Sequence, residues 1–164
     1  MRYDPAPTPG TLSYRRTGDA LILRGDVADR QLCRLALQQW IKRQARAHLV
    51  PWLTEVSQGL QLPVGRVMVR CQRSRWGSCS RHRTISLNQK LLFVPTPLVR
   101  YVFVHELCHV VHFDHSPAFW DYLAQHEPEW KALDEELDMA WRYVPLWASS
   151  PGPAEAPDHA LAVT

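Results

Sequence analysis

The stretch from Tyr101 to Trp120 reads YVFVHELCHVVHFDHSPAFW, and the rest of the sequence is best interpreted outward from it. Its centre, residues 105–109, reads HELCH, an HExxH motif that follows a strongly apolar run. The apolar run predicts that the helix is buried, and a buried charge is costly unless it is paired or bound to a metal. The motif therefore predicts a metal site.

The spacing of the motif suits zinc. Two residues four positions apart on an α-helix share one face and lie about 6 Å apart along its axis. The rings of His105 and His109 can therefore converge on one ion, because zinc binds imidazole nitrogens at about 2.0–2.1 Å in a tetrahedral arrangement. Glu106 lies next to the first histidine, where its carboxylate can take a proton from a zinc-activated water. These residues predict a zinc hydrolase with Glu106 as the base.

A catalytic zinc site needs a third protein ligand and an open fourth position. His112 lies on the same helical stripe, but it is about 10.5 Å along the axis from His105, too far for one tetrahedral ion. The chain must therefore turn back after His109, and residues 113–117 (FDHSP) suit such a turn. His115 is the preferred third ligand. The alternative third ligands are carboxylates. One is Asp114, which directly precedes His115, and the others are glutamates further along the chain: Glu127, Glu129, Glu135 and Glu136.

Alternating apolar and polar residues predict short strands elsewhere in the chain. A hairpin is expected within residues 11–24. Two further strands are expected over 66–72 and 84–88, either as a longer hairpin or as neighbouring strands. Helical patterns lie between and after these strands. This order of elements predicts an α+β fold.

Helix-start and helix-stop residues place the helices. Asp29 or Asp26 caps a long helix that reaches residue 60, with a kink or break expected at Pro51. Thr96 is the expected N-cap of the HExxH helix, which continues to Val111. Two further helices begin at Ser116-Pro117 and at Pro128, and the last one reaches about Met139.

Composition limits the class of protein. The chain has 164 residues, of which 46% are hydrophobic, enough for one domain with its own core. Proline and small residues predict flexible tails over 1–10 and 148–164, which leaves a single domain over 11–147. We find no 18-residue apolar run and no export signal, so we expect no membrane contact, a cytoplasmic location and four reduced cysteines.

Four motifs in order resemble the YgjP-like metallopeptidase family, a zincin group related to the SprT-like and WLM-type proteases. They are SRWGSC at 74–79, ISLN at 85–88, YVFVHELCH at 101–109, and HS at 115–116 with FW at 119–120. The resemblance covers about residues 30–140. It implies an α+β zincin fold in which a small mixed or antiparallel sheet packs on the HExxH helix beside further helices. It also implies zinc held by His105, His109 and His115, with Glu106 as the catalytic base.

The leading functional interpretation is a zinc metallopeptidase acting on a peptide or protein substrate, with the strand around 85–88 aligning an extended peptide. One alternative is a metal-dependent UTP pyrophosphatase, because this activity is described for some members of the family that the sequence resembles. A second alternative is a non-catalytic zinc-binding module, in which a protein ligand closes the fourth position. The nucleotide alternative, and nucleic acid as a further partner, depend on the arginines of one segment: Arg70, Arg73, Arg75, Arg81 and Arg83. The formal net charge of +3 gives nucleic acid little support.

Three residues outside the HExxH stretch need interpretations of their own. Arg75 either binds a substrate carboxylate or phosphate or pairs with a buried acid. Trp76 is favoured as a packing residue of a strand turn. Asn88 either offers its amide to substrate or caps a turn.

Overall fold

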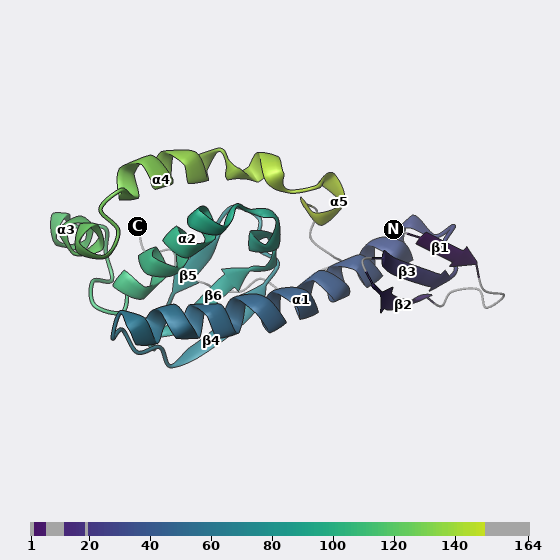
Figure 1. Ribbon diagram of the computed structural model, residues 1–164, viewed down its shortest axis with the longest axis horizontal. Coiled ribbons are helices and arrows are strands. Elements are labelled where there is room, and N and C mark those ends of the chain that lie inside the picture. The colour runs from purple at the N-terminus through teal and green to yellow at the C-terminus, as the bar shows by residue number, and fades with distance from the viewer. Residues whose placement is uncertain (1, 6–11, 19, 150–164) are drawn as a thin grey trace.

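A computed structural model of the protein describes residues 2–5, 12–18 and 20–149. Two three-stranded sheets lie at different positions along one long helix (Figure 1). The first sheet consists of β1 (Arg2–Pro5), β2 (Leu12–Thr17) and β3 (Ala20–Gly25), in the order β1-β3-β2. β2 and β3 form the expected antiparallel hairpin, and β1 pairs parallel to β3.

The first strand differs from the expectation of a tail over residues 1–10. Arg2–Pro5 forms β1, whereas residues 6–11 lie outside the described part of the chain. At the other end, residues 148 and 149 belong to the short helix α5 (Leu146–Ser149), and the rest of the expected C-terminal tail also lies outside it. The domain boundaries of 11–147 stay a prediction.

Helix α1 (Arg30–Gly59) connects the two sheets. Asp29 caps it, because its carboxylate accepts from the backbone N–H groups of Gln31 at 2.8 Å and Leu32 at 3.1 Å. The expected break at Pro51 is absent, and the helix runs through this residue. Pro51 and Ala47 are both exposed, so water can reach the carbonyl that the proline leaves without a donor.

The second sheet consists of β4 (Arg66–Arg70), β5 (Gly77–Cys79) and β6 (Thr84–Asn88), in the order β4-β6-β5. β4 pairs parallel to β6, so the two strands are neighbours and not a hairpin. β5 pairs antiparallel to the other side of β6. The central place of β6 corrects one expectation: both of its edges are occupied, and it cannot align a substrate strand.

Helix α2 (Thr96–Cys108) carries the HExxH motif and contacts β5, α1, α3 (Pro117–His126) and α4 (Trp130–Asp138). Its N-cap is Pro95 and not Thr96, and it ends at Cys108, because the chain turns over residues 109–111. Two short 3-10 helices, η1 (Gln89–Phe93) and η2 (Ala140–Tyr143), complete the body.

The apolar core supports the motif directly. Leu53 of α1, Ile85 and Leu87 of β6, and Phe103 and Leu107 of α2 are fully buried in one cluster. A smaller cluster joins the N-terminal half of α1 to the first sheet. The α+β fold, with a small mixed sheet packed on the HExxH helix, is therefore confirmed. Among the described residues, no helix has the length and apolar character needed to cross a bilayer.

Candidate metal centre

Three histidines converge at the C-terminal end of α2. His105 and His109 lie on one face of the helix, and the turn that follows brings His115 back against them. The Nε2 atom of His115 lies 3.1 Å from Nε2 of His105 and 3.1 Å from Nε2 of His109. Among the described residues, these three are the group of His, Cys, Asp and Glu whose spacing suits a metal.

Hydrogen bonds alone do not account for this arrangement. One ring nitrogen carries either one proton or one lone pair, so Nε2 of His115 cannot satisfy two such neighbours at once. Two nitrogens bound at about 2.0–2.1 Å to one tetrahedral zinc ion lie about 3.3–3.4 Å apart, close to the separations found here. The donor set therefore fits a zinc ion.

Neighbouring groups orient the rings. Nδ1 of His109 lies 2.9 Å from the carbonyl oxygen of His112; because a carbonyl only accepts, this nitrogen carries the proton and Nε2 keeps its lone pair. The indole Nε1 of Trp120 donates to the carbonyl oxygen of His115 at 3.1 Å. The ring of His112 takes no part in the cluster, as expected, and packs on Tyr122 instead.

Phe119 packs against all three rings. It is fully buried, and its ring centroid lies 5.0, 4.4 and 4.9 Å from those of His105, His109 and His115. The FW pair at 119–120 was noted in the sequence only as part of a family motif. Its structural role is to fix the positions of the three histidine rings.

Burial keeps His105 and His109 neutral. Loss of solvation, aided by the neighbouring imidazoles, lowers the pKa of His105 to about 3. Burial also lowers the pKa of His109. Both rings are therefore neutral at physiological pH, which is the form that binds a metal ion.

Glu106 is buried beside the histidines and lies against the backbone of β5. A Cβ atom at Gly77 would lie 2.5 Å from Oε1 and 2.7 Å from Cγ of this glutamate. Oε2 of Glu106 has no hydrogen-bond partner in the described part of the chain. Burial raises the pKa of this carboxyl to about 8, and the charge of Arg75 opposes the shift. An unpaired carboxyl beside the neutral imidazoles of His105 and His109 is what a bound cation would stabilise.

Gly77 is a site residue that the sequence analysis missed. In the sequence this glycine appears only within the segment 74–79, with no link to Glu106. The only signal was its place in the SRWGSC motif. Only glycine leaves room for the glutamate side chain here, because any Cβ would overlap it.

The segment that leads into β5 is held by Asn88. The side-chain amide of Asn88 donates to the carbonyls of Gln72 at 3.1 Å and Arg75 at 2.9 Å, and its Oδ1 accepts from the backbone N–H of Lys90. Asn88 is fully buried, so its role is structural and it is not a substrate contact. Trp76 is also a packing residue, stacked on Trp141 with ring centroids 4.1 Å apart.

The alternative carboxylate ligands are engaged elsewhere or lie outside the histidine group. Glu127 forms an ion pair with Arg100, and Asp114 accepts from the backbone N–H of Ser116 at 3.3 Å. The remaining candidates, which do not join the group, are Glu129, Glu135 and Glu136. None of the four cysteines forms a disulfide bond, and none lies within the group.

The family profile of the YgjP-like metallopeptidase domain matches residues 11–140. The chain belongs to the YgjP-like metallopeptidase family. This match confirms the resemblance that the four sequence motifs indicated. The protein is therefore a metal-dependent, peptidase-like hydrolase.

Two solved structures are similar to this YgjP-like protein. The metallopeptidase zymogen jannalysin of Methanocaldococcus jannaschii is 18% identical, with a TM-score of 0.46 over 53% of this chain and 90% of that chain. The metallopeptidase zymogen abylysin of Pyrococcus abyssi is 22% identical, with a TM-score of 0.46 over 64% of this chain and 95% of that chain. A comparison with curated proteins finds no match.

Proposed function

We propose that this YgjP-like protein is a zinc-dependent peptidase in which His105, His109 and His115 hold the metal and Glu106 is the catalytic base. The observation that carries the proposal is the convergence of three Nε2 atoms beside a buried carboxyl that lacks a partner among the described residues. A cytoplasmic location stays a prediction.

The donor set supports zinc over other common metals. Magnesium and calcium prefer oxygen ligands, whereas imidazole suits zinc. The described residues offer three ligands and no fourth His, Cys, Asp or Glu in the group, and His115 is exposed. A structural zinc site closes its fourth position with a protein ligand, so the arrangement favours an enzyme over a non-catalytic module.

Glu106 has the position and the chemistry of a proton carrier. When bound, zinc supplies an electrophile for the scissile carbonyl and activates a water molecule. Glu106 would take a proton from a water molecule held there and would later give it to the leaving amine. Burial raises the pKa of this carboxyl to about 8, and the charge of Arg75 favours its ionised form.

Strand β5 supports peptide binding, in place of β6. The carbonyl of Trp76 accepts from Asn88 and the N–H of Ser80 donates to Thr84, each at 2.9 Å. Because bonding directions alternate along a strand, the main-chain groups of Gly77 and Cys79 point away from β6. An extended peptide paired with these groups would lie beside Glu106, which already contacts Gly77.

Assays on the purified protein distinguish the candidate activities. We expect zinc at one equivalent by elemental analysis, cleavage of unstructured casein and of fluorogenic peptides, and loss of both cleavage reactions with a chelator. Zinc should restore them. Release of pyrophosphate from UTP without peptide cleavage would contradict the proposal and select the nucleotide alternative. Four protein ligands on a bound zinc would select the non-catalytic module.

Gly77→Ala is expected to lower kcat for peptide cleavage by about 100-fold while zinc is retained, because a displacement of about 1 Å in a catalytic group has this effect. The added methyl would push the Glu106 carboxylate out of place. Steady-state kinetics and zinc content measure the two effects. Gly59→Ala is the matched control, since a Cβ there meets no atom within 4 Å. Equal kinetics for both variants would show that Gly77 does not position the base.

A further inference from the structure

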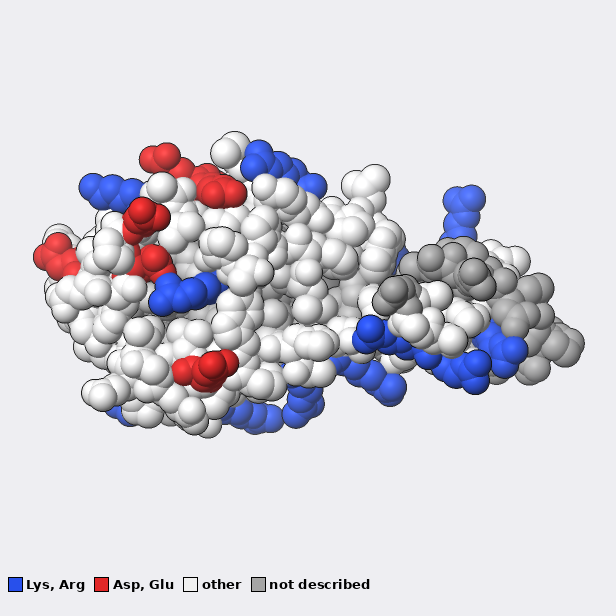
Figure 2. Space-filling model, viewed as in Figure 1, with Lys and Arg blue, Asp and Glu red and all other residues white. Residues whose placement is uncertain are grey.

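The small net charge conceals a strong separation of charge along the chain. Residues 1–83 contain 15 Lys and Arg against 5 Asp and Glu, whereas residues 84–164 contain 4 against 11. Figure 2 shows the result on one face: acidic residues gather over α3 and α4, and basic residues predominate over the first sheet and along α1. The first sheet lies away from the end of α2 where the histidines converge (Figure 1).

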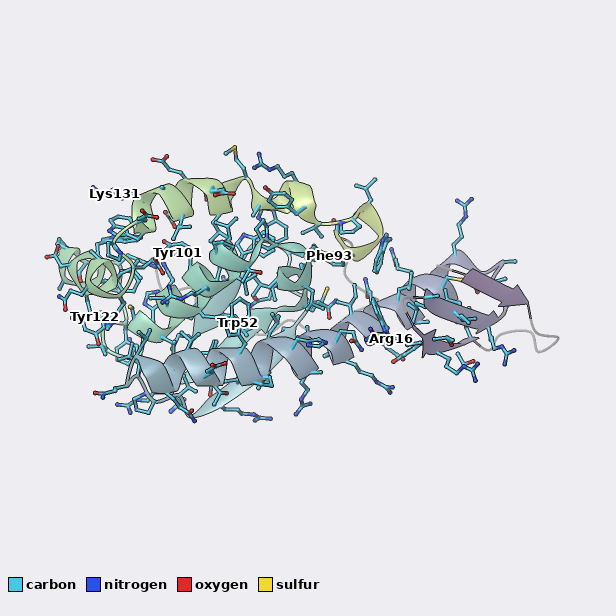
Figure 3. The ribbon with its side chains drawn as sticks, viewed as in Figure 1. Arg16, Trp52, Phe93, Tyr101, Tyr122 and Lys131 are labelled. Atoms are coloured by element: carbon cyan, nitrogen blue, oxygen red, sulfur yellow. The ribbon has the colours of Figure 1, made fainter. Side chains whose placement is uncertain are left out.

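Helix α1 and strand β2 form the centre of the basic region. The 30 residues of α1 include five Lys and Arg but a single acidic residue, Glu55. Gln39, Arg43 and Arg46 follow one another at helical spacing and share one face, and both arginines are exposed. Arg16 of β2 is exposed and lies where the first sheet approaches α1 (Figure 3).

A hollow with a volume of about 380 Å³ opens between β2 and α1 beside these cations. The guanidinium carbon of Arg43 lies 5.7 Å from the ring centroid of Tyr14, at the side of this hollow. The hydroxyl of Tyr14 is buried and has no hydrogen-bond partner in the described structure. The lining combines apolar with polar side chains: Leu12, Ser13, Tyr14, Leu32, Leu35, Ala36, Gln39 and Arg43.

The chemistry of this region favours a phosphate polymer. Of the nine cations in residues 1–46, eight are arginine, whose planar fork matches phosphate oxygens. A surface that binds membranes also needs exposed apolar side chains. The large exposed hydrophobic side chains of the described chain all lie at position 111 or beyond, outside the basic region.

We propose that the first sheet and the N-terminal half of α1 bind single-stranded nucleic acid, independently of the proposed peptidase site. Arg16, Arg43 and Arg46 contact backbone phosphates, and the hollow beside Tyr14 takes an unstacked base. Single strands are favoured over duplex because the bases of a duplex are stacked inside it, out of reach of such a hollow.

Fluorescence anisotropy with labelled 20-nucleotide oligo-dT and oligo-U tests the proposal on the full zinc-loaded chain. Binding should weaken as salt rises from 50 to 300 mM, with a slope that reflects the number of phosphate contacts. The double variant Arg43→Gln/Arg46→Gln should weaken binding by about tenfold and reduce the slope by about 1.4. The double variant Lys131→Gln/Arg142→Gln removes two exposed cations from the acidic end, and it should bind as the unchanged protein does.

Two changes at Tyr14 test the hollow. Tyr14→Leu removes the aromatic ring and should weaken binding of single strands by about fivefold or more, whereas Tyr14→Phe keeps the ring and most of the affinity. Peptide cleavage and thermal unfolding should be unchanged in the arginine variants.

Several results would overturn the proposal. These are no binding of either oligonucleotide at 50 mM salt, equal weakening by the Lys131/Arg142 control, or binding of phosphatidylserine vesicles in place of oligonucleotides. Two results together would also overturn it: equal affinity for a 20-base-pair duplex and for single strands, and unchanged affinity in the Tyr14→Leu variant. Neither is expected of a surface that holds an unstacked base.

Discussion

Glu106→Gln is expected to retain zinc and to lower kcat/KM for peptide cleavage by about 10²–10⁴-fold, the usual contribution of a general base. The amide has nearly the same shape as the carboxylate but cannot take the proton of a water molecule. It also keeps the contact with Gly77, so the fold and the histidines should stay in place. Zinc content and steady-state kinetics on a fluorogenic peptide measure the two quantities.

The matched control is Glu135→Gln, which removes an exposed carboxylate on α4 and should leave the kinetics unchanged.

Calorimetry of zinc binding gives a second measurement of the role of Glu106. Without metal, burial raises the pKa of Glu106 to about 8, so at pH 7 most of this carboxyl is protonated. A bound cation favours the charged form, and zinc uptake should therefore release a proton that the Glu106→Gln variant does not release. Cleavage by the variant at the normal rate would remove Glu106 from the role of base.

His115→Ala is expected to lower zinc affinity by more than about 100-fold, because it removes a ligand, and changes to groups that only support ligands already cost about 10–100-fold. Peptide cleavage should fall with it. His115 is exposed, so the stability of the metal-free protein should change little. The stabilisation that added zinc gives the unchanged protein, about 2.7 kcal/mol at a concentration of 100 Kd, should fall to about 0.4 kcal/mol or less in the variant at the same zinc concentration.

His112→Ala is the matched control for this change, three positions away in the same turn. The structure uses only the backbone carbonyl of His112, which the substitution preserves, to hold Nδ1 of His109. Zinc affinity should therefore be close to that of the unchanged protein. A loss of affinity in His112→Ala as large as in His115→Ala would show that the ligand assignment is wrong.

Local spacing made the central part of the site predictable. The four-residue interval between His105 and His109 depends only on helix geometry, and the need for a turn before a third ligand pointed to His115. The structure brings these three histidines together. The hairpin of β2 and β3 and the Asp29 cap were predictable for the same reason, since each involves residues close in sequence.

The fold differs from the sequence-based predictions where the local sequence is compatible with more than one structure. A proline-rich segment reads as a tail, yet Arg2–Pro5 pairs with β3. Two alternating strands do not reveal their relative direction, and β4 and β6 are parallel. The total charge of +3 hid a separation that counting by segment would have shown.

The sequence by itself determined the chemistry of this protein: two histidines and a glutamate at helical spacing, a third histidine after a turn, and an α+β order of elements. Only the tertiary structure decided how that chemistry is held and presented. Gly77 makes room for Glu106, Phe119 packs the three rings, and β5 forms the edge beside them. Helix periodicity links residues a few positions apart, whereas each of these contacts joins different elements and depends on how the chain packs as a whole.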